Sequence, residues 1–173
     1  MLSRIFGGTP DRARLQPLYG QVVAIGRDPA WYRQGQVPDT VTGRFDVIAA
    51  VLSLVLLRLE QEEDREARTA SALLTELFVD DMDGSLRQIG IGDLVVGKHI
   101  GRIMGALGGR LTAFRAALGD RQELEAAVNR NIFHEGAPSP AAIGFVAERL
   151  AHLAAAMRDK SAAALLAGDL PRP

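Results

Sequence analysis

Residues 45–59, FDVIAAVLSLVLLRL, are the most apolar segment of the sequence and lie inside a helix predicted over residues 43–63. Its longest apolar run, residues 47–57, is about half of the ~20 residues that a helix needs to span a bilayer. Apolar side chains at helical spacing form one stripe of this helix, and others cover a second side. A helix that is apolar on nearly every side belongs at the centre of a bundle, so we predict a buried core helix.

Helical periodicity continues on both sides of this segment, and helix start signals recur at regular intervals. Further helices are predicted after Asp11, over residues 30–33, 70–82 and 94–118, after Asp120, and over residues 141–166. Gly84 is expected to end the 70–82 helix. The sequence therefore predicts an all-α protein. It is a single helical bundle of about six to seven helices over residues 11–168, with an N-terminal arm over residues 1–10 and a frayed C-terminus over residues 169–173.

The composition excludes several classes of site. The chain has 173 residues, no cysteine and a net charge of -1. It therefore has no disulfides, thiolate metal sites or cysteine nucleophiles, and the near-neutral charge argues against DNA as a partner. His99, His134 and His152 lie far apart and lack the spacing of metal ligands. No metal and no cofactor are predicted.

Three carboxylates, Asp80, Asp81 and Asp83, precede Gly84 and form what we call the acidic run. A calcium loop does not fit, because Val79 and the glycine at position 90 would stand where carboxylates are required. Carboxylates at a helix C-terminus oppose the helix dipole, so pairing with Arg87 or Lys98 is expected. A paired-carboxylate acid–base site remains an alternative interpretation.

Glycines recur every fourth residue at Gly97, Gly101, Gly105 and Gly109, inside the predicted helix over residues 94–118. Each interior glycine costs a helix about 0.8–1 kcal/mol relative to alanine, so this glycine stripe needs a reason. Two interpretations stay open. The stripe either packs closely against a neighbouring core helix, or forms an open groove for a partner helix. Basic residues on the same helix, with no acid among them, suit an anionic surface: Lys98, Arg102, Arg110 and Arg115.

The stretch over residues 80–98, DDMDGSLRQIGIGDLVVGK, and its continuation MGALGGR over residues 104–110 resemble the ubiquinol–cytochrome c chaperone family of the bacterial type. The upstream segments PAWY (29–32) and VPDTVTGRFD (37–46), and the downstream segment NRNIF (129–133), resemble the same family in the same order. Gly97 and Gly101 depart from the pattern, since bulkier residues are expected there.

The resemblance implies an assembly factor that binds newly made cytochrome b and promotes assembly of the ubiquinol–cytochrome c reductase complex by groove binding without catalysis. It further implies a small helper subunit, the ribosome exit region and the anionic membrane surface as partners, and a cytoplasmic protein with peripheral contact to the inner membrane. By matching position, the expected interaction residues are Asp80, Asp81, Asp83, Arg87, Gly92, Asp93, Lys98 and Arg110, with Arg44 and Asp46 as secondary candidates and Gly101 and Gly105 from the glycine stripe.

Two other functions fit the residues alone. One is a small helical enzyme that uses the carboxylates between Asp80 and Asp83, which would need a deep polar pocket around them. The other is a helical oligomerisation module, which would need a symmetric apolar patch. Asp93 also has a purely structural interpretation as the N-cap of the helix over residues 94–118.

Overall fold

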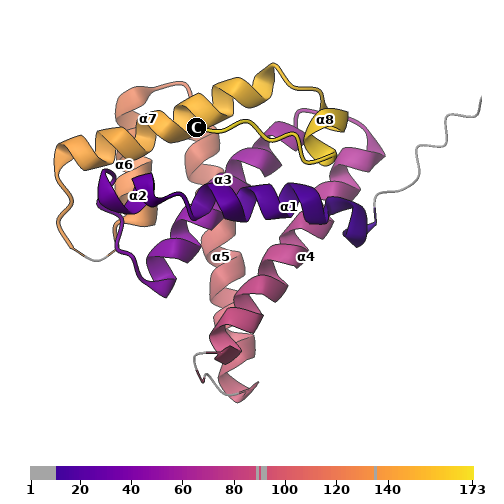
Figure 1. Cartoon of the computed structure of the whole chain (residues 1–173), viewed down its shortest axis with the longest axis horizontal. Coiled ribbons are helices and arrows are strands. Elements are labelled where there is room, and N and C mark those ends of the chain that lie inside the picture. Colours follow the sequence, from indigo (N-terminus) through magenta and orange to yellow (C-terminus); the bar gives the residue numbers. More distant parts are fainter. Residues whose placement is uncertain (1–10, 89, 91–92, 135) are drawn as a thin grey trace, which may run out of the picture.

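The computed structural model describes residues 11–88, 90, 93–134 and 136–173, and for residues 93–96 it describes the backbone alone. Within this part of the chain all regular structure is helical, which confirms the predicted all-α class (Figure 1). The helices are α1 (Arg12–Gly26), α2 (Pro29–Arg33), α3 (Val41–Leu59), α4 (Arg65–Gln88), α5 (Asp93–Ala117), α6 (Arg121–Ile132), α7 (Pro140–Arg158) and α8 (Ala162–Leu166).

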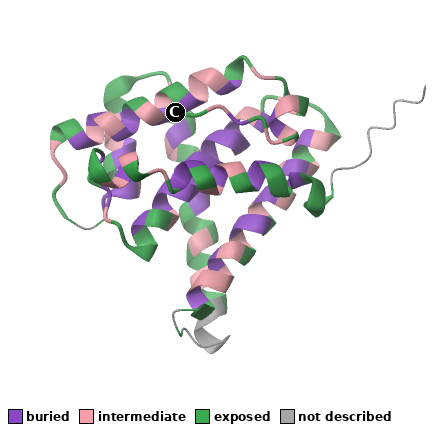
Figure 2. Cartoon of the chain, viewed as in Figure 1, coloured by how far each residue is buried: buried purple, intermediate pink, exposed green. Residues whose placement is uncertain are grey.

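Helix α3 is the centre of the bundle, as its sequence predicts. It packs against α1, α4, α5, α6 and α7, and it is buried over most of its length (Figure 2). Leu52, Leu54 and Leu59 are among the largest side chains that are fully enclosed. The buried hydroxyl of Ser53 donates to the Ala49 carbonyl at 2.7 Å, so this polar group is satisfied within the helix.

The predicted helix starts are confirmed where their caps are described. Each capping side chain accepts a hydrogen bond from a backbone N–H two or three residues later, at 2.8–3.2 Å. Proline occupies the first turn of α2 and of α7. Because caps satisfy backbone donors that the helix itself leaves free, they fix where these helices begin. The capping residues are Asp11, Asp28, Thr40, Asp120 and Ser139.

The prediction that Gly84 ends a helix is wrong. Helix α4 runs through Gly84 to Gln88, and it begins at Arg65, five residues before the predicted start. Met82 and Leu86 are both buried on either side of the glycine, so apolar packing holds the helix together through it. An interior glycine lowers helix stability by about 1 kcal/mol, which such packing readily exceeds.

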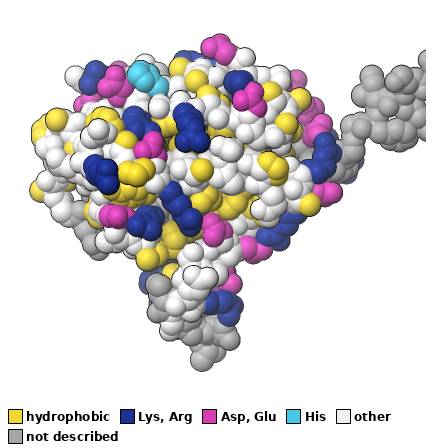
Figure 3. Space-filling view, in the orientation of Figure 1, with side chains coloured by type: hydrophobic (Ala, Val, Ile, Leu, Met, Phe, Trp, Pro, Cys, Tyr) yellow, Lys and Arg dark blue, Asp and Glu magenta, His cyan; other side chains and the backbone are white. Residues whose placement is uncertain are grey.

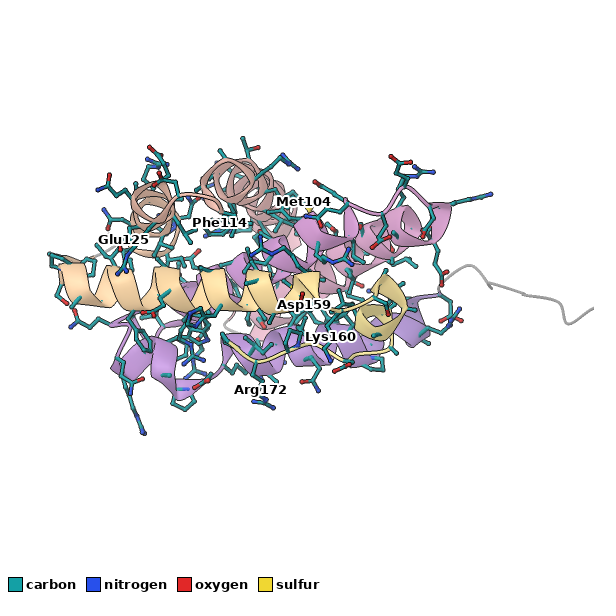
Figure 4. The ribbon with its side chains drawn as sticks, turned by 90° about the horizontal axis from the view of Figure 1, so that it is seen from above. Met104, Phe114, Glu125, Asp159, Lys160 and Arg172 are labelled. Atoms are coloured by element: carbon teal, nitrogen blue, oxygen red, sulfur yellow. The ribbon has the colours of Figure 1, made fainter. Side chains whose placement is uncertain are left out.

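The helix predicted over residues 141–166 is divided into α7 and the short α8. Arg58 lies where α7 ends: its guanidinium donates to the carbonyls of Met157 at 3.2 Å and Lys160 at 2.9 Å. These contacts satisfy carbonyls that a continuous helix would have used itself. Figure 4 shows Asp159 and Lys160 at this junction, seen from above.

The C-terminal residues, expected to fray, instead contact the domain. Leu170 is buried in the core, and the Asp169 carboxylate pairs with the Lys160 ammonium at 2.5 Å. The buried Leu170 side chain and the ion pair between Asp169 and Lys160 hold this segment against the domain. Fraying was predicted from chain position, whereas burial of the segment decides its order.

Helices α4 and α5 pack against each other and extend together away from the rest of the bundle (Figure 1). Their far ends form the tip of what we call the α4–α5 hairpin, residues 79–105. The residues that carry the family resemblance at positions 80–98 lie in this hairpin. The fold thus separates a compact body around α3 from a projecting pair of helices.

Candidate functional site

The acidic run lies on α4 and is held by other parts of the chain. The guanidinium of Arg12 pairs with the Asp80 carboxylate, and the Tyr19 hydroxyl donates to the Asp81 carboxylate at 2.7 Å. Asp83 pairs with Arg87 one turn later, at 2.9 Å, as the sequence predicts. Two of the three carboxylates therefore connect α4 to α1.

A shallow cleft between α1 and α4 includes Asp80 and Asp81. Its volume is about 490 Å³, and it is lined by residues of both helices, among them Arg12, Tyr19 and Arg27. Asp83 is not among its lining residues. Burial, with the Asp81 contact as the second cause, raises the pKa of the Tyr19 phenol far above its ordinary value, so Tyr19 stays protonated and donates. The cleft does not enclose Asp80 and Asp83 together, which the enzyme interpretation requires.

The glycine stripe on α5 faces open space. A Cβ built at Gly97, Gly101, Gly105 or Gly109 would meet no atom of the described chain within 4 Å beyond the helix itself. All four positions are exposed. Of the two interpretations left open by the sequence, close packing against a core helix is therefore wrong. The stripe is a free, side-chain-poor surface on the outside of the molecule.

The basic residues of α5 divide into two groups. Lys98 and Arg102 are exposed beside the glycine stripe. Arg110, predicted to belong to the interaction surface, is instead 4% exposed and pairs with the Asp46 carboxylate on α3. Its guanidinium also donates to the Asn131 carbonyl at 2.8 Å. Arg110 and Asp46 thus join α3, α5 and the end of α6 in the interior, and neither forms part of the surface.

The buried pair has an unfavourable electrostatic environment. Burial raises the pKa of the Asp46 carboxyl, although Arg110 and His134 both act to lower it. Burial likewise lowers the pKa of Arg110, against the attraction of Asp46. Removing two charges from water is costly, and the attraction between them offsets only part of that cost. The His134 ring nitrogen Nε2 lies 3.5 Å from Asp46, at the edge of this cluster.

Three predicted interaction residues remain, namely Arg44, Gly92 and Asp93. Arg44 is exposed at the start of α3 and pairs with Asp39 at 2.7 Å. Gly92 and the Asp93 side chain lie outside the described residues; α5 begins at Asp93, one residue before the predicted start. On the face in Figure 3, basic and acidic side chains are interspersed, in line with the net charge of -1.

The comparisons with known proteins agree with this architecture. The family model for the ubiquinol-cytochrome C chaperone matches residues 33–170. The chain belongs to this family. The crystal structure of the Cbp3 homolog from Brucella abortus is similar, with a TM-score of 0.82 and 32% sequence identity over 93% of this chain and 89% of that chain. The comparison with curated proteins gave no match. Family and structure support a role as an assembly chaperone for the cytochrome bc1 complex.

Several segments that resemble the chaperone family form the interior of this member. Trp31 is fully buried, its indole N–H donates to the Ile25 carbonyl at 2.7 Å, and the Arg149 guanidinium lies 4.4 Å from its ring centroid. A Cβ at Gly43 would lie 2.0 Å from the Pro38 carbonyl oxygen, so only glycine fits this approach. These residues maintain the fold of the chaperone, whereas the α4–α5 hairpin carries part of the pattern on the surface.

Sequence reasoning missed one surface feature of the chaperone. A cleft of about 420 Å³ lies where the C-terminal ends of α3, α5 and α7 meet, with an apolar floor and arginines at its edge. Arg115 there pairs with Glu60 at 2.7 Å. No local sequence pattern predicts such a cleft, because its lining comes from three segments that lie far apart in the chain. The lining residues are Leu54, Leu57, Arg58, Glu60, Gln61, Arg115, Leu118, Gly119, Ala151, Ala154, Met157 and Arg158.

No helix in the described part of the chain combines the length and hydropathy that crossing a membrane requires. Among the same residues, no group of three or more histidine, aspartate or glutamate side chains is arranged to hold a metal ion.

Proposed function

We propose that this assembly chaperone holds newly made cytochrome b on the exposed half of α5, without catalysis. The observation that carries the proposal is the glycine stripe, which the fold leaves open to solvent beside Lys98 and Arg102. The family supplies the process, assembly of the cytochrome bc1 complex, and the stripe supplies a surface for the client.

The stripe suits a transmembrane helix as its ligand. Helices that pack in lipid approach each other closely through small residues at every fourth position, and Gly97, Gly101 and Gly105 have this spacing. Each of these glycines weakens α5, and no packing contact within the described chain requires any of them. A helix of the client could lie along this surface with its backbone near that of α5.

The charges next to the stripe suit an anionic surface. Lys98 and Arg102 are exposed on the same half of α5. Lysine and arginine near a bilayer are attracted to anionic lipid at about 1 kcal/mol each, and they also bind RNA phosphates. We include the anionic membrane surface and the ribosome exit region among the proposed partners for this reason. A small helper subunit stays a proposal from the family alone.

The acidic run is proposed to position the hairpin for its client. Asp80 and Asp81 are engaged with Arg12 and Tyr19 of α1, and Asp83 is engaged with Arg87. These contacts orient α4, and α4 in turn supports the exposed half of α5. The carboxylates would act through geometry, and not as acids or bases.

The test replaces Gly101 and Gly105 together by leucine in cells that depend on this chain for the complex. Both Cβ positions are open, so we expect the variant to fold, with two leucines covering the stripe. We expect loss of the spectroscopic signal of haem b in assembled complex. The matched control replaces the same glycines by alanine, which adds only a methyl group to each position. A second control is Gly20→Leu on α1, where a Cβ also meets no atom within 4 Å.

Normal assembly in the leucine variant, with protein levels equal to the wild type, would contradict the proposal. Loss of assembly in the Gly20→Leu control as well would show that the effect is not specific to α5. A defect confined to Asp80→Asn and Asp83→Asn proteins that fold normally would favour the enzyme interpretation instead.

A further inference from the structure

Basic side chains gather around the short helix α2. Arg27 lies just before this helix, Arg33 is its last residue, and Arg44 lies near the start of α3. Burial raises the pKa of the Tyr32 phenol on α2 to about 12, while Arg44 and Arg27 both act to lower it. Both guanidinium groups are therefore close to the same ring, although they come from different segments of the chain.

Two further arginines reach the same place from the C-terminal part of the chain. The Arg149 guanidinium on α7 pairs with the Asp28 carboxylate at 2.7 Å. The Ala30 N–H is the first cause of the lowered pKa of Asp28, and the attraction of Arg149 and of Arg172 lowers it further. We call the five arginines around α2 the arginine patch: Arg27, Arg33, Arg44, Arg149 and Arg172.

The arginine patch carries more positive charge than its neighbours compensate. Two carboxylates lie within it, and each is paired with one arginine, Asp28 with Arg149 and Asp39 with Arg44. The other three guanidinium groups are exposed and form no hydrogen bond or ion pair with another described residue. Five arginines and two carboxylates leave a net charge of +3, in a chain whose total charge is -1.

The arginine patch includes an exposed apolar residue and faces away from α5. Val41 is 40% exposed in the first turn of α3, three residues before Arg44 and therefore on the same side of the helix. Figure 4 labels Arg172 on one side of the molecule and Met104 of α5 on the opposite side. The arginine patch and the glycine stripe thus belong to different faces.

These features favour an anionic bilayer as the partner. Arginines near a bilayer are attracted to anionic lipid, and an apolar side chain among them can enter the boundary between headgroups and acyl chains. Single-stranded nucleic acid usually stacks its bases on aromatic rings. Trp31 is fully buried, and the partly buried Tyr32 donates its hydroxyl to the Gly26 carbonyl at 2.6 Å, so neither ring is free for stacking.

We propose that the arginine patch binds the phosphate groups of an anionic bilayer, with Val41 inserted at the bilayer surface. The proposal does not depend on the client surface of α5. It places the bilayer on a different face from Lys98 and Arg102, so the two basic surfaces can engage two anionic bodies at once. A protein held in this way keeps the glycine stripe turned away from the lipid.

Sedimentation of the full-length protein with vesicles tests the proposal. The vesicles contain either phosphatidylcholine alone or equal parts of phosphatidylcholine and phosphatidylglycerol. We expect the wild type to sediment with the anionic vesicles only, and less so at higher salt, because salt screens exposed charges. The triple variant Arg27→Gln, Arg33→Gln, Arg172→Gln should bind on the order of 100-fold more weakly, since each cation near anionic lipid contributes about fivefold to the affinity.

The matched control removes three exposed arginines from other parts of the surface, by substitution to glutamine at Arg65, Arg130 and Arg158. It has the same net charge as the first triple variant and should bind almost as well as the wild type. Val41→Ser, which changes no charge, should weaken binding several-fold.

Three results would overturn the proposal. One is a wild type that does not sediment with the anionic vesicles. Another is an equal loss of binding in both triple variants, which would show that binding follows net charge and not this face. The third is displacement of the protein from the vesicles by polyuridine RNA that the first triple variant fails to bind, which would assign the arginine patch to nucleic acid.

Discussion

The two halves of α5 share one helix and a glycine-rich sequence, yet they have opposite surroundings. The first half exposes Gly97, Lys98, Gly101 and Arg102. The second half turns Leu107, Arg110, Phe114 and Ala117 into the core, where it packs against α3 and α6. Figure 2 shows the change in burial along the helix. The exposed half is thus left free by the fold, and the buried half is required by it.

The difference in burial between the two halves of α5 distinguishes residues of the family pattern that the fold requires from residues that are free to bind a partner. Arg110 and Asp46 belong to the pattern and are buried against each other, so their presence is explained by structure alone. Gly101 and Lys98 belong to the same stretch of helix and make no comparable contact in the described chain. Residues that the fold does not need, but that lower helix stability, are the better candidates for binding another chain.

The largest effect on stability is expected from Arg110→Met in the buried half. Removing one partner of a buried ion pair leaves the Asp46 charge without compensation, which typically costs about 3–5 kcal/mol. Urea denaturation should show this loss in the free energy of unfolding. Substituting both partners, Arg110→Met with Asp46→Leu, should recover most of it, because no charge then remains buried. A single variant as stable as the wild type would mean that the pair is not buried as described.

Two glycine-to-alanine variants should change stability in opposite directions. Gly43→Ala brings a Cβ within 2.0 Å of the Pro38 carbonyl oxygen, so the loop must shift, at a cost of about 1–3 kcal/mol. Gly105→Ala meets nothing within 4 Å and should stabilise α5 by about 0.8–1 kcal/mol. Thermal unfolding of the Gly43→Ala and Gly105→Ala proteins, each compared with the wild type, measures the two changes in stability. Destabilisation by Gly105→Ala would mean that the stripe is packed, contrary to the structure.

The smallest effect is expected at Asp28, the N-cap of α2. The backbone N–H of Ala30, and next the Arg149 guanidinium at 2.7 Å, lower the pKa of this carboxyl. A lowered folded-state pKa means that the stabilisation is complete above the unfolded value of ~3.9 and is lost as pH falls through the folded value. Asp28→Asn keeps the cap, so the variant should be less stable at pH 7 by at most ~1 kcal/mol, because the carboxyl is partly exposed.

Urea denaturation of wild type and Asp28→Asn at pH 7 and pH 3 measures the difference in unfolding free energy. The gap between the two proteins should narrow at pH 3. A gap that widens on acidification would contradict the assigned direction of the pKa.

Local signals in the sequence predicted the body well. The caps at Asp11 and Asp120 act over three residues, so their signal is local. The apolar pattern of residues 45–59 identifies the core helix without knowledge of its neighbours. The break after Arg158 was missed although Ser161 caps α8 locally, and the Arg58 guanidinium that donates to the Lys160 carbonyl there is 102 residues away in the chain. The role of Arg110 was missed because Asp46 is 64 residues distant.

The glycine stripe shows where sequence reasoning reaches its limit. Spacing alone allowed either close packing or an open surface, and only the positions of the neighbouring helices decide between them. Gly84 shows the opposite case, in which the sequence predicted one outcome and the fold has another. Glycine often ends a helix, but α4 continues through Gly84 because Met82 and Leu86 on either side of it are buried. In both cases the deciding contacts come from tertiary structure.

Site-specific photocrosslinking in cells that are making the complex tests directly whether the exposed half of α5 binds cytochrome b. A photoreactive side chain is placed at Gly105 in the exposed half of α5, and at Gly20 on α1 as the matched control. We expect cytochrome b to be captured from position 105 and not from position 20. Equal capture of cytochrome b from both positions, or capture from neither while the complex is being assembled, would show that this half of α5 is not the binding surface.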